Sequence, residues 1–255
     1  MKPLEIKHRV IGGGEPLICV PVVEQDAQSV IREITYLSQS TADMIEWRVD
    51  AFRDFTDYNA IRSVFEAVAP LLGEKLFLYT FRTAHQGGMA QVKAEQLDDL
   101  HDLAAESGCV DLVDLEFFEE DRPLHKIKRL REMGVSVIAS HHDFEQTPPP
   151  EVMKMLLEKM CAGGADIVKL AVMPQNYKDV LNLLDVTAQF KEENPDTPVI
   201  TMSMGALGGI SRVCGETFGS CVTFGAHEKP SAPGQFAMKE LRQMLDTIHA
   251  SSQTQ

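Results

Sequence analysis

The stretch Ala165-Asp-Ile-Val-Lys-Leu-Ala-Val-Met-Pro174 has the composition of a buried β-strand with one lysine at its centre. Alternation along a strand places Ile167, Lys169 and Ala171 on one face and three larger aliphatic residues on the other. An ammonium group in such surroundings is costly, because desolvation favours the neutral amine, and a neutral amine is a nucleophile. A lysine at a strand end whose amine reaches solvent is the simpler interpretation of this stretch alone. The rest of the chain decides between the two interpretations.

The composition of the chain excludes several classes of protein. Its 255 residues suit either two domains or one α/β barrel, which typically takes about 250 residues. With 24 basic and 38 acidic residues the net charge is −14, and no Lys/Arg cluster runs along any segment, so nucleic acid and anionic membranes are poor partners. Five cysteines without a Cys-x-x-Cys pattern indicate reduced thiols and a cytoplasmic protein. The N-terminal segment lacks the apolar region of a signal peptide, so we expect neither export nor a membrane span.

Short apolar runs alternate with helical stretches from residue 17 onward, which predicts an α/β fold, a (β/α)8 TIM barrel formed as one domain by residues 1–255. No Gly-x-Gly-x-x-Gly motif supports the alternative, an open doubly wound sheet. Residues 4–10 alternate weakly before a run of three glycines, which indicates a short N-terminal hairpin or flap over one end of the barrel. The eight expected strands lie around residues 18–22, 44–49, 76–81, 112–115, 135–141, 167–171, 199–202 and 221–224.

Helices are expected between these strands, and spaced apolar residues predict their buried sides. The first such set is Val30, Ile34 and Leu37, and the last is Leu241, Met244, Leu245 and Ile248.

The inward face of the predicted barrel carries charge where a purely packed core would be apolar. The large apolar residues of each strand must face the helices. Alternation then places these polar residues on the inward face: Glu46, Arg48, Asp50, Arg82, Asp114, Glu116, Ser140, His142 and Lys169. Unpaired groups of this kind are strongly destabilising, so we expect a charge-compensated network. His142 and Lys169 are 169 − 142 = 27 residues apart, about one βαβ unit, which places them on neighbouring strands. Polar residues near the carboxyl ends of barrel strands indicate an active site, and a purely structural network is the alternative.

Other motifs are less specific. No spacing typical of metal ligands is present, so we expect no metal, although Asp114 and Glu116 are residue types that could bind one. Gly205-Ala-Leu-Gly-Gly209 has the composition of a loop whose backbone N–H groups bind an anion, or of a mobile loop. Residues 225–234 form a long loop bracketed by glycines, where we expect a lid.

Taken together, motifs along nearly the whole chain resemble the type I 3-dehydroquinate dehydratases. The motifs that carry the resemblance are Glu46-Trp-Arg48-Val-Asp50, Phe81-Arg82-Thr83, Asp114-Leu-Glu116, Ser140-His-His-Asp-Phe144, Val168-Lys169, Met202-Ser-Met-Gly205, Ser211-Arg212 and Ser231-Ala-Pro-Gly-Gln235. The resemblance implies a cytoplasmic homodimer that needs no metal or cofactor. Such an enzyme dehydrates the small molecule 3-dehydroquinate to 3-dehydroshikimate in the shikimate pathway of aromatic amino acid biosynthesis.

The resemblance also assigns roles to single residues. Lys169 matches the imine-forming lysine and His142 the proton-transferring histidine. The residues that match substrate-contacting positions of the family are Glu46, Arg48, Arg82, Arg212, Ser231 and Gln235. Phe224 matches a residue of the pocket wall. A lysine imine draws off the negative charge that develops when the α-proton of a β-hydroxy ketone leaves. The histidine can then take that proton and protonate the departing hydroxyl, while the fork of Arg212 suits the substrate carboxylate.

The chain departs from the family pattern at Gln86, four residues after Arg82, where the family has a glutamate facing the histidine. Gln86 therefore belongs with the catalytic group, and it can hydrogen-bond an imidazole without stabilising its charged form as a carboxylate would. Two rival interpretations follow, a class I aldolase on the same barrel and a binding barrel that has lost turnover through Gln86. A class I aldolase would share the lysine but should not need the Ser140-His-His-Asp143 and Ser231–Gln235 motifs together. Retention of both Lys169 and His142 argues against the binding barrel.

Overall fold

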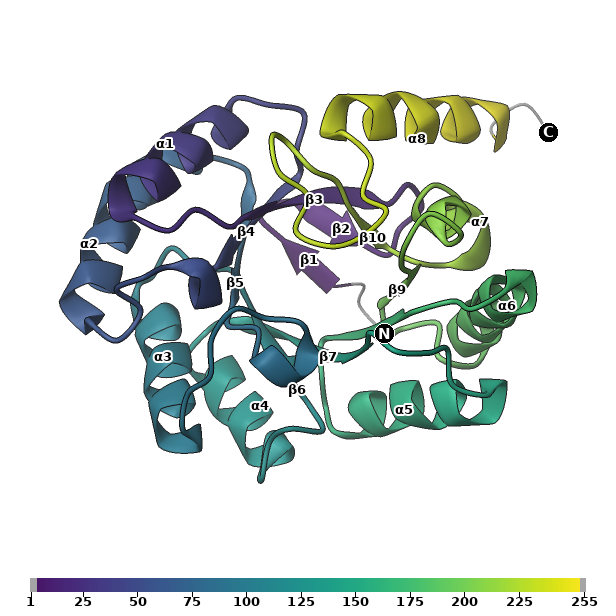
Figure 1. Ribbon diagram of the computed structural model, residues 1–255, viewed down its shortest axis with the longest axis horizontal. Coiled ribbons are helices and arrows are strands. Elements are labelled where there is room, and N and C mark those ends of the chain that lie inside the picture. The colour runs from purple at the N-terminus through teal and green to yellow at the C-terminus, as the bar shows by residue number, and fades with distance from the viewer. Residues whose placement is uncertain (1–3, 253–255) are drawn as a thin grey trace.

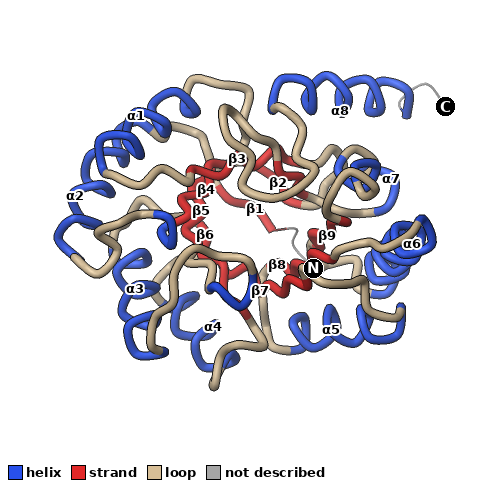
Figure 2. Tube along the Cα trace, in the orientation of Figure 1, coloured by secondary structure: helices blue, strands red, loops and turns tan. Residues whose placement is uncertain are grey.

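The computed structural model describes residues 4–252, which form a ring of parallel strands surrounded by helices (Figure 1). Within this range eight strands make one sheet in the order β10-β3-β4-β5-β6-β7-β8-β9. Figure 2 shows them as a central ring with the helices outside. The predicted TIM barrel is confirmed, and its strands are β3 (Leu17–Val22), β4 (Met44–Arg48), β5 (Leu76–Thr80), β6 (Leu112–Glu116), β7 (Ser136–Asp143), β8 (Ile167–Val172), β9 (Val199–Ser203) and β10 (Val222–Phe224).

Helices connect successive strands on the outside of the ring. Asp26, Asp57 and Asn176 begin three of them, since each side chain accepts backbone N–H groups that the first helical turn leaves free. The helices are α1 (Ala27–Ser38), α2 (Tyr58–Val68), α3 (Ala94–Glu106), α4 (Pro123–Glu132), α5 (Pro150–Ala162), α6 (Tyr177–Glu193), α7 (Gly215–Phe218) and α8 (Met238–Ser252). Short 3-10 turns are η1 (Val49–Ala51), η2 (Ala69–Leu71), η3 (Ala84–Gln86) and η4 (Gly209–Arg212).

The barrel closes between β9 and β10 through fewer backbone contacts than elsewhere. Ser220, just before β10, forms a single parallel bridge with Val199. The backbone N–H of Cys221 donates to the Val199 carbonyl at 2.8 Å, and the Thr201 N–H donates to the Ser220 hydroxyl at 3.0 Å. A side-chain oxygen thus replaces one ladder bond at the seam, and the ring is nearly closed.

The hydrophobic core has two layers, as alternation along the strands requires. The outer layer lies between strands and helices and contains the outward aromatic residues Trp47, Phe77 and Tyr79. The inner layer fills the barrel with residues such as Leu78 and Ile138. Residues of this layer such as Met44, Leu76 and Leu112 lie at the amino-terminal ends of the strands and fill the barrel below the charged residues. Other members of the layer lie at the carboxyl ends and line the pocket: Ala171, Met202, Met204 and Phe224.

The N-terminal hairpin is confirmed. Strands β1 (Leu4–Ile6) and β2 (Arg9–Ile11) pair in antiparallel fashion, and Ile11 is buried in the inner apolar layer. Lys7 pairs with Asp111 at 2.7 Å and Arg9 with Asp43 at 2.9 Å. Because Asp43 and Asp111 directly precede β4 and β6, the hairpin covers the amino-terminal end of the barrel.

The predicted helix faces are correct for the first helix and partly wrong for the last. Val30, Ile34 and Leu37 are buried in α1. In α8 the buried residues are Met238, Leu241 and Leu245, whereas Ile248 is half-buried and Met244 is 37% exposed. Helix α8 packs on the barrel along a narrow stripe, and Met244 falls beside this stripe rather than on it.

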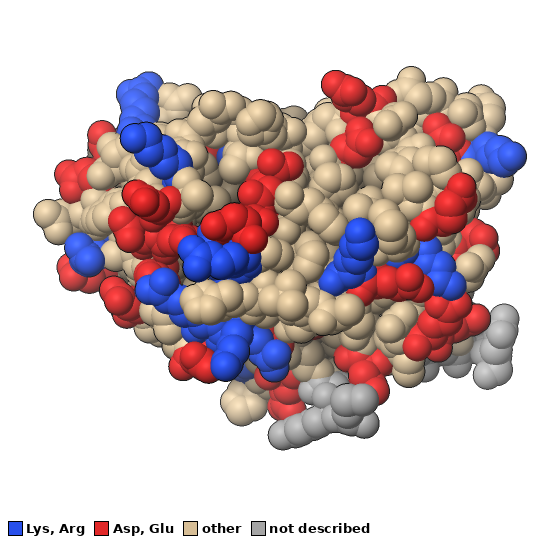
Figure 3. Space-filling model, turned by 90° about the horizontal axis from the view of Figure 1, so that it is seen from below, with Lys and Arg blue, Asp and Glu red and all other residues tan. Residues whose placement is uncertain are grey.

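The surface mixes both signs of charge, as Figure 3 shows for the face seen from below. Helix α4 is the most basic helix, and its cations are paired with carboxylates: Lys126 with Asp98, Arg129 with Asp102 and Arg131 with Asp166. Within residues 4–252, no helix has the length and apolar character that crossing a membrane requires.

Candidate active site

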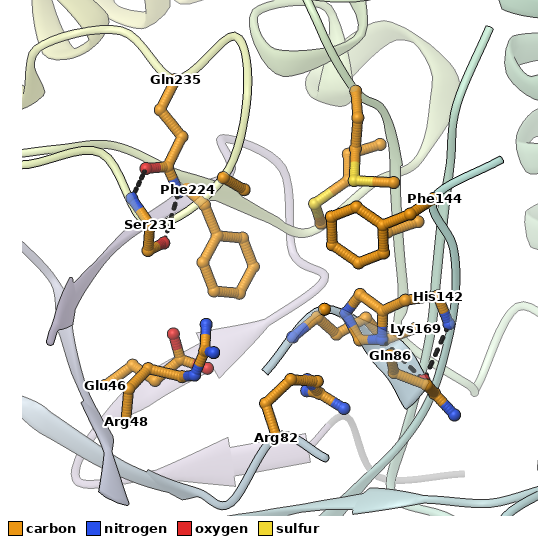
Figure 4. Close-up of a pocket in the computed structure, with 15 residues that line it drawn as sticks. Glu46, Arg48, Arg82, Gln86, His142, Phe144, Lys169, Phe224, Ser231 and Gln235 are labelled. Carbon is orange, nitrogen blue, oxygen red and sulfur yellow. Dashed lines mark hydrogen bonds between the residues drawn. The ribbon is translucent and has the colours of Figure 1, made fainter. Parts of the chain in front are cut away.

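A pocket opens at the carboxyl ends of the strands, opposite the end that the hairpin covers (Figure 4). The carboxyl end is where loops of parallel barrels build their active sites. Nine of the ten residues singled out from the sequence line this pocket: Glu46, Arg48, Arg82, Gln86, His142, Lys169, Phe224, Ser231 and Gln235.

Lys169 is buried at the base of the pocket, with 3% of its surface exposed. Its Nζ lies 3.0 Å from Oδ2 of Asp114 and 4.6 Å from the centre of the Phe224 ring. The simpler interpretation, a lysine whose amine reaches solvent, is therefore wrong. The ion pair with Asp114 stabilises the ammonium and opposes the desolvation, so burial alone does not supply a neutral amine.

Asp114 is the centre of the buried charge network. Its Oδ1 accepts from the Ser140 hydroxyl at 2.6 Å and lies 2.7 Å from Nη2 of Arg82, whose Nη1 lies 2.9 Å from Glu116. Burial alone would raise the pKa of Asp114, but the Arg82 guanidinium and the Lys169 ammonium outweigh it and hold the pKa well below its ordinary range. The predicted charge-compensated network is present.

A second ion pair holds Arg48 in the pocket wall. Its Nε and Nη2 each donate to Asp50 at 2.8 Å, the fork geometry that fixes a guanidinium most firmly. Asp50 also accepts the backbone N–H groups of Arg82 and Met89, so it ties the end of β4 to the segment after β5. Glu46 accepts from the Thr80 hydroxyl at 2.8 Å.

His142 and Lys169 lie on the neighbouring strands β7 and β8, as their spacing predicted, with Ser140 directly opposite Lys169. Gln86 faces His142: its Oε1 accepts the His142 backbone N–H at 2.9 Å and lies 3.0 Å from His142 Nδ1. A backbone N–H can only donate, so the oxygen of the Gln86 amide must face it, and Nδ1 must then carry the proton that this oxygen accepts. The neutral ring is left with a free lone pair on Nε2. Burial, and then the Arg82 and Lys169 cations, lower the pKa of His142 well below its ordinary value, which favours this neutral form.

The loop 225–237, between β10 and α8, forms the other side of the pocket (Figures 1 and 4). Ser231 and Gln235 form two hydrogen bonds with each other. The Ser231 backbone N–H donates to Gln235 Oε1 at 2.7 Å, and Gln235 Nε2 donates to the Ser231 hydroxyl at 3.0 Å. Further along, the Pro233 carbonyl accepts from the Gly205 N–H at 3.1 Å. Gly234 has φ +77° and lies against the Gly205 backbone, where a side chain has no space.

Arg212 is the predicted site residue that the structure does not place among the described pocket-lining residues. It is 1% exposed, and its Nη2 donates to the Pro233 carbonyl at 3.0 Å. Its Nε and Nη1 have no hydrogen-bond partner among residues 4–252. Burial without a carboxylate lowers the pKa of Arg212 to about 10. This buried cation lacks the anion that would balance it.

Sequence reasoning placed Asp114 and Asp50 in the inward charged network but gave them no role of their own in the site, although they hold its cations. It also left out Phe144, which stacks near the His142 ring with centroids 6.4 Å apart and lines the pocket. One signal could have found the role of Asp114. Inward residues of alternate strands share a layer in a TIM barrel, and β6 and β8 are alternate strands, so Asp114 was a candidate partner for Lys169.

Comparison with known proteins agrees with this geometry over the full length of the barrel. The family profile of "Type I 3-dehydroquinase" matches residues 18–252. The chain belongs to the type I 3-dehydroquinase family. A 3-dehydroquinate dehydratase from Syntrophotalea carbinolica is 41% identical over 250 residues, which are 98% of this chain and 99% of that protein.

Solved structures give the same result. A type I 3-dehydroquinate dehydratase from Clostridium difficile is 39% identical, with a TM-score of 0.94 over 98% of this chain and 99% of that one. The 3-dehydroquinate dehydratase of Geobacillus kaustophilus is 35% identical, with a TM-score of 0.95 over 98% of both chains. The family predicted from the motifs is confirmed. In the part of the chain that the structure describes, no group of three or more His, Cys, Asp or Glu side chains is arranged to hold a metal ion.

Proposed function

We propose that this chain dehydrates 3-dehydroquinate to 3-dehydroshikimate through an imine at Lys169, with His142 as the group that moves protons. The hydro-lyase activity in the shikimate pathway is that of the family to which the chain belongs. The observation that carries the residue assignment is that the buried Lys169 amine and the His142 ring, oriented by Gln86, open into one pocket.

The proposed sequence of steps uses groups already described. Lys169 transfers a proton to His142 and attacks the substrate ketone. His142 returns that proton to the carbinolamine hydroxyl, which leaves as water and gives a protonated imine. His142, kept neutral by its surroundings, takes the α-proton on Nε2 and returns it to the departing hydroxyl. Hydrolysis of the product imine then restores Lys169.

The unpaired Arg212 supports binding of the substrate carboxylate. A buried guanidinium with two free donors is stabilised by an anion that accepts both of them. Arg48, Arg82, Glu46, Ser231 and Gln235 surround the remaining pocket surface and offer hydrogen bonds to the hydroxyl groups of the substrate.

The test is turnover followed by chemical trapping. Addition of 3-dehydroquinate is expected to give an enone absorbance that grows in proportion to enzyme concentration. Borohydride added with the substrate is expected to leave a covalent adduct on Lys169 in peptide mass mapping. Lys169→Ala should lose both signals, while Lys128→Ala, which changes an exposed lysine on α4, should keep both. An adduct on another lysine contradicts the assignment.

The same experiment separates the two rivals. A class I aldolase would form the imine without producing the enone, and a binding barrel weakened by Gln86 would give neither signal. The hydrogen bond that Gln86 still makes to His142 argues against loss of turnover.

The homodimer and the cytoplasmic location remain predictions. The five cysteines, all within the described range, are unpaired, which suits a reducing compartment. Freedom from metal and cofactor also remains a prediction, and full activity after dialysis against a chelator is its test.

A further inference from the structure

The family pattern places a carboxylate directly beside the catalytic histidine. In this chain Gln86 takes that place, and a carboxylate, Glu119, lies on the far side of the Gln86 amide. Gln86 is buried, and its Oε1 is occupied by the backbone N–H and Nδ1 of His142. Its Nε2 therefore points the other way, and it donates to Oε1 of Glu119 at 3.5 Å. Glu119 is exposed and lies on the loop between β6 and α4.

We propose that Glu119 is a positioning residue, which holds the Gln86 amide so that His142 keeps its Nδ1 proton and offers Nε2 as the base. This inference rests on the proposed function. A buried amide donor needs an acceptor, and Glu119 provides one for Nε2. The His142 backbone N–H requires the oxygen of the Gln86 amide, and an acceptor at Nε2 stabilises the same orientation of that amide.

The pairing also explains why a neutral residue stands at position 86. A glutamate there would place one carboxylate oxygen at His142 and the other against Glu119, at a distance where two like charges destabilise each other. The neutral Gln86 amide is thus compatible with an acceptor at Glu119, whereas a second carboxylate at position 86 is not. A carboxylate at one of the two positions suits this site, but carboxylates at both do not.

The charged groups that act on His142 come from four segments of the barrel. They are Arg82 after β5, Lys169 on β8, Asp114 on β6 and Arg48 on β4, of which only Asp114 favours the imidazolium. Glu119 acts from outside this set, through the Gln86 amide. Its removal should therefore disturb the orientation and tautomer of the ring more than the affinity for substrate.

The test is a double-mutant cycle of Glu119→Ala and Gln86→Glu, with kcat and KM measured across pH. In the wild-type background we expect Glu119→Ala to lower kcat about two- to tenfold with little change in KM. Glu119→Gln keeps an acceptor for Nε2 and should restore most of the rate. In the Gln86→Glu background the sign should reverse, so that removing Glu119 raises kcat. Gln86→Glu itself should move the acidic limb of the pH profile upward, because a carboxylate favours the imidazolium.

Glu145→Gln is the matched control, since Glu145 is exposed on the β7–α5 loop three residues after His142. Nitrogen-15 NMR of labelled histidine reads the tautomer without any turnover: the wild type should show His142 protonated at Nδ1, and Glu119→Ala a mixture of tautomers. Equal effects of Glu119→Ala in both backgrounds, or an unchanged tautomer, would overturn the proposal. Loss of enone formation in the wild type itself would instead overturn the proposed function, and the tautomer measurement would still decide the role of Glu119.

Discussion

At the scale of single residues, the site depends on one carboxylate that balances two cations. Asp114 lies between Lys169 at 3.0 Å and Arg82 at 2.7 Å, and all three are buried. The two ion pairs are not equivalent when one partner is removed. Without Lys169, Asp114 still has Arg82 and Ser140, whereas without Asp114 the Lys169 ammonium has lost its carboxylate.

We therefore expect substitutions of the two partners, Asp114 and Lys169, to change the stability of the fold by different amounts. Asp114→Asn should destabilise the fold by about 3–5 kcal/mol, because it leaves a buried cation without its counter-charge. Lys169→Met should change stability by less than about 1.5 kcal/mol while abolishing turnover, because it replaces the amine with an apolar chain of similar length. Urea denaturation at pH 7 measures both. Equal stability of the two variants would show that Asp114 is not what balances the network.

At the scale of elements, the loop 225–237 is held at both ends in the position that closes the pocket. Near its start, His227 stacks on Tyr36 of α1 with ring centroids 4.0 Å apart, and its Nδ1 lies 2.7 Å from Glu33. Near its end, Pro233 accepts from Arg212 and from the Gly205 backbone. The segment between these attachments carries Ser231 into the pocket, and that this loop opens as a lid stays a prediction.

Gly234→Ala is expected to prevent this closed position. A methyl group at Gly234 would lie 2.3 Å from the Gly205 carbonyl oxygen, and φ is +77°. We expect kcat/KM to fall about tenfold or more, because Ser231 and Gln235 lose their place, and amide exchange of the loop to stay fast with saturating ligand. Gly164→Ala is the control, since Gly164 has φ +85° with open space around it. If both variants behave alike, backbone strain alone explains the effect and the lid contact is unimportant.

At the scale of the whole molecule, the outer core contains one histidine that the catalytic site does not use. His101 on α3 is 3% exposed beside Tyr79, and neither of its ring nitrogens has a partner within the described part of the chain. Burial, and then the Lys126 cation, lower the pKa of His101 from 6.5 to about 4 in the folded protein. The unfolded chain therefore binds a proton more readily than the folded one.

This difference predicts acid sensitivity of the fold. The contribution of His101 is fully present above pH 6.5 and is lost as the pH falls to about 4, a loss of about 3 kcal/mol. His101→Leu should be at least as stable as the wild type at pH 7, since it removes two unsatisfied polar atoms, and should lose less stability at pH 5. Denaturant titrations at both pH values test this, with His125→Leu on the exposed side of α4 as the control. The same pH dependence in wild type and His101→Leu would assign the acid sensitivity to other groups.

The homodimer implied by the family has a candidate contact surface at this scale. Helix α6 and the segment after β9 expose apolar side chains: Tyr177 by 78%, Leu181 by 64%, Leu207 by 38% and Ile210 by 55%. We expect these exposed apolar side chains to be buried against a second copy of the chain. Sedimentation should show a dimer for the wild type and a larger monomer fraction for Leu181→Glu. A monomeric wild type would contradict the homodimer, and a dimeric Leu181→Glu would place the interface elsewhere.

The sequence by itself determined the strands, the direction of their side chains and the family. Alternation is a local property, so Trp47 and Tyr79 had to face the helices once Glu46 and Arg48 faced inward, and the motifs carried the identity of the pocket. The prediction that Met244 is buried was wrong, because the width of the buried face of a helix depends on the barrel surface against which it packs.

Only the tertiary structure decided which charged groups meet. Asp114 reaches Lys169 from an alternate strand 55 residues away, and Arg82 reaches Glu116 across 34 residues. Such contacts are set by the stagger of the strands and the path of the loops, which no local pattern records. For the same reason the sequence assigned Arg212 to the substrate but did not show that its guanidinium is buried under the lid, held by Pro233.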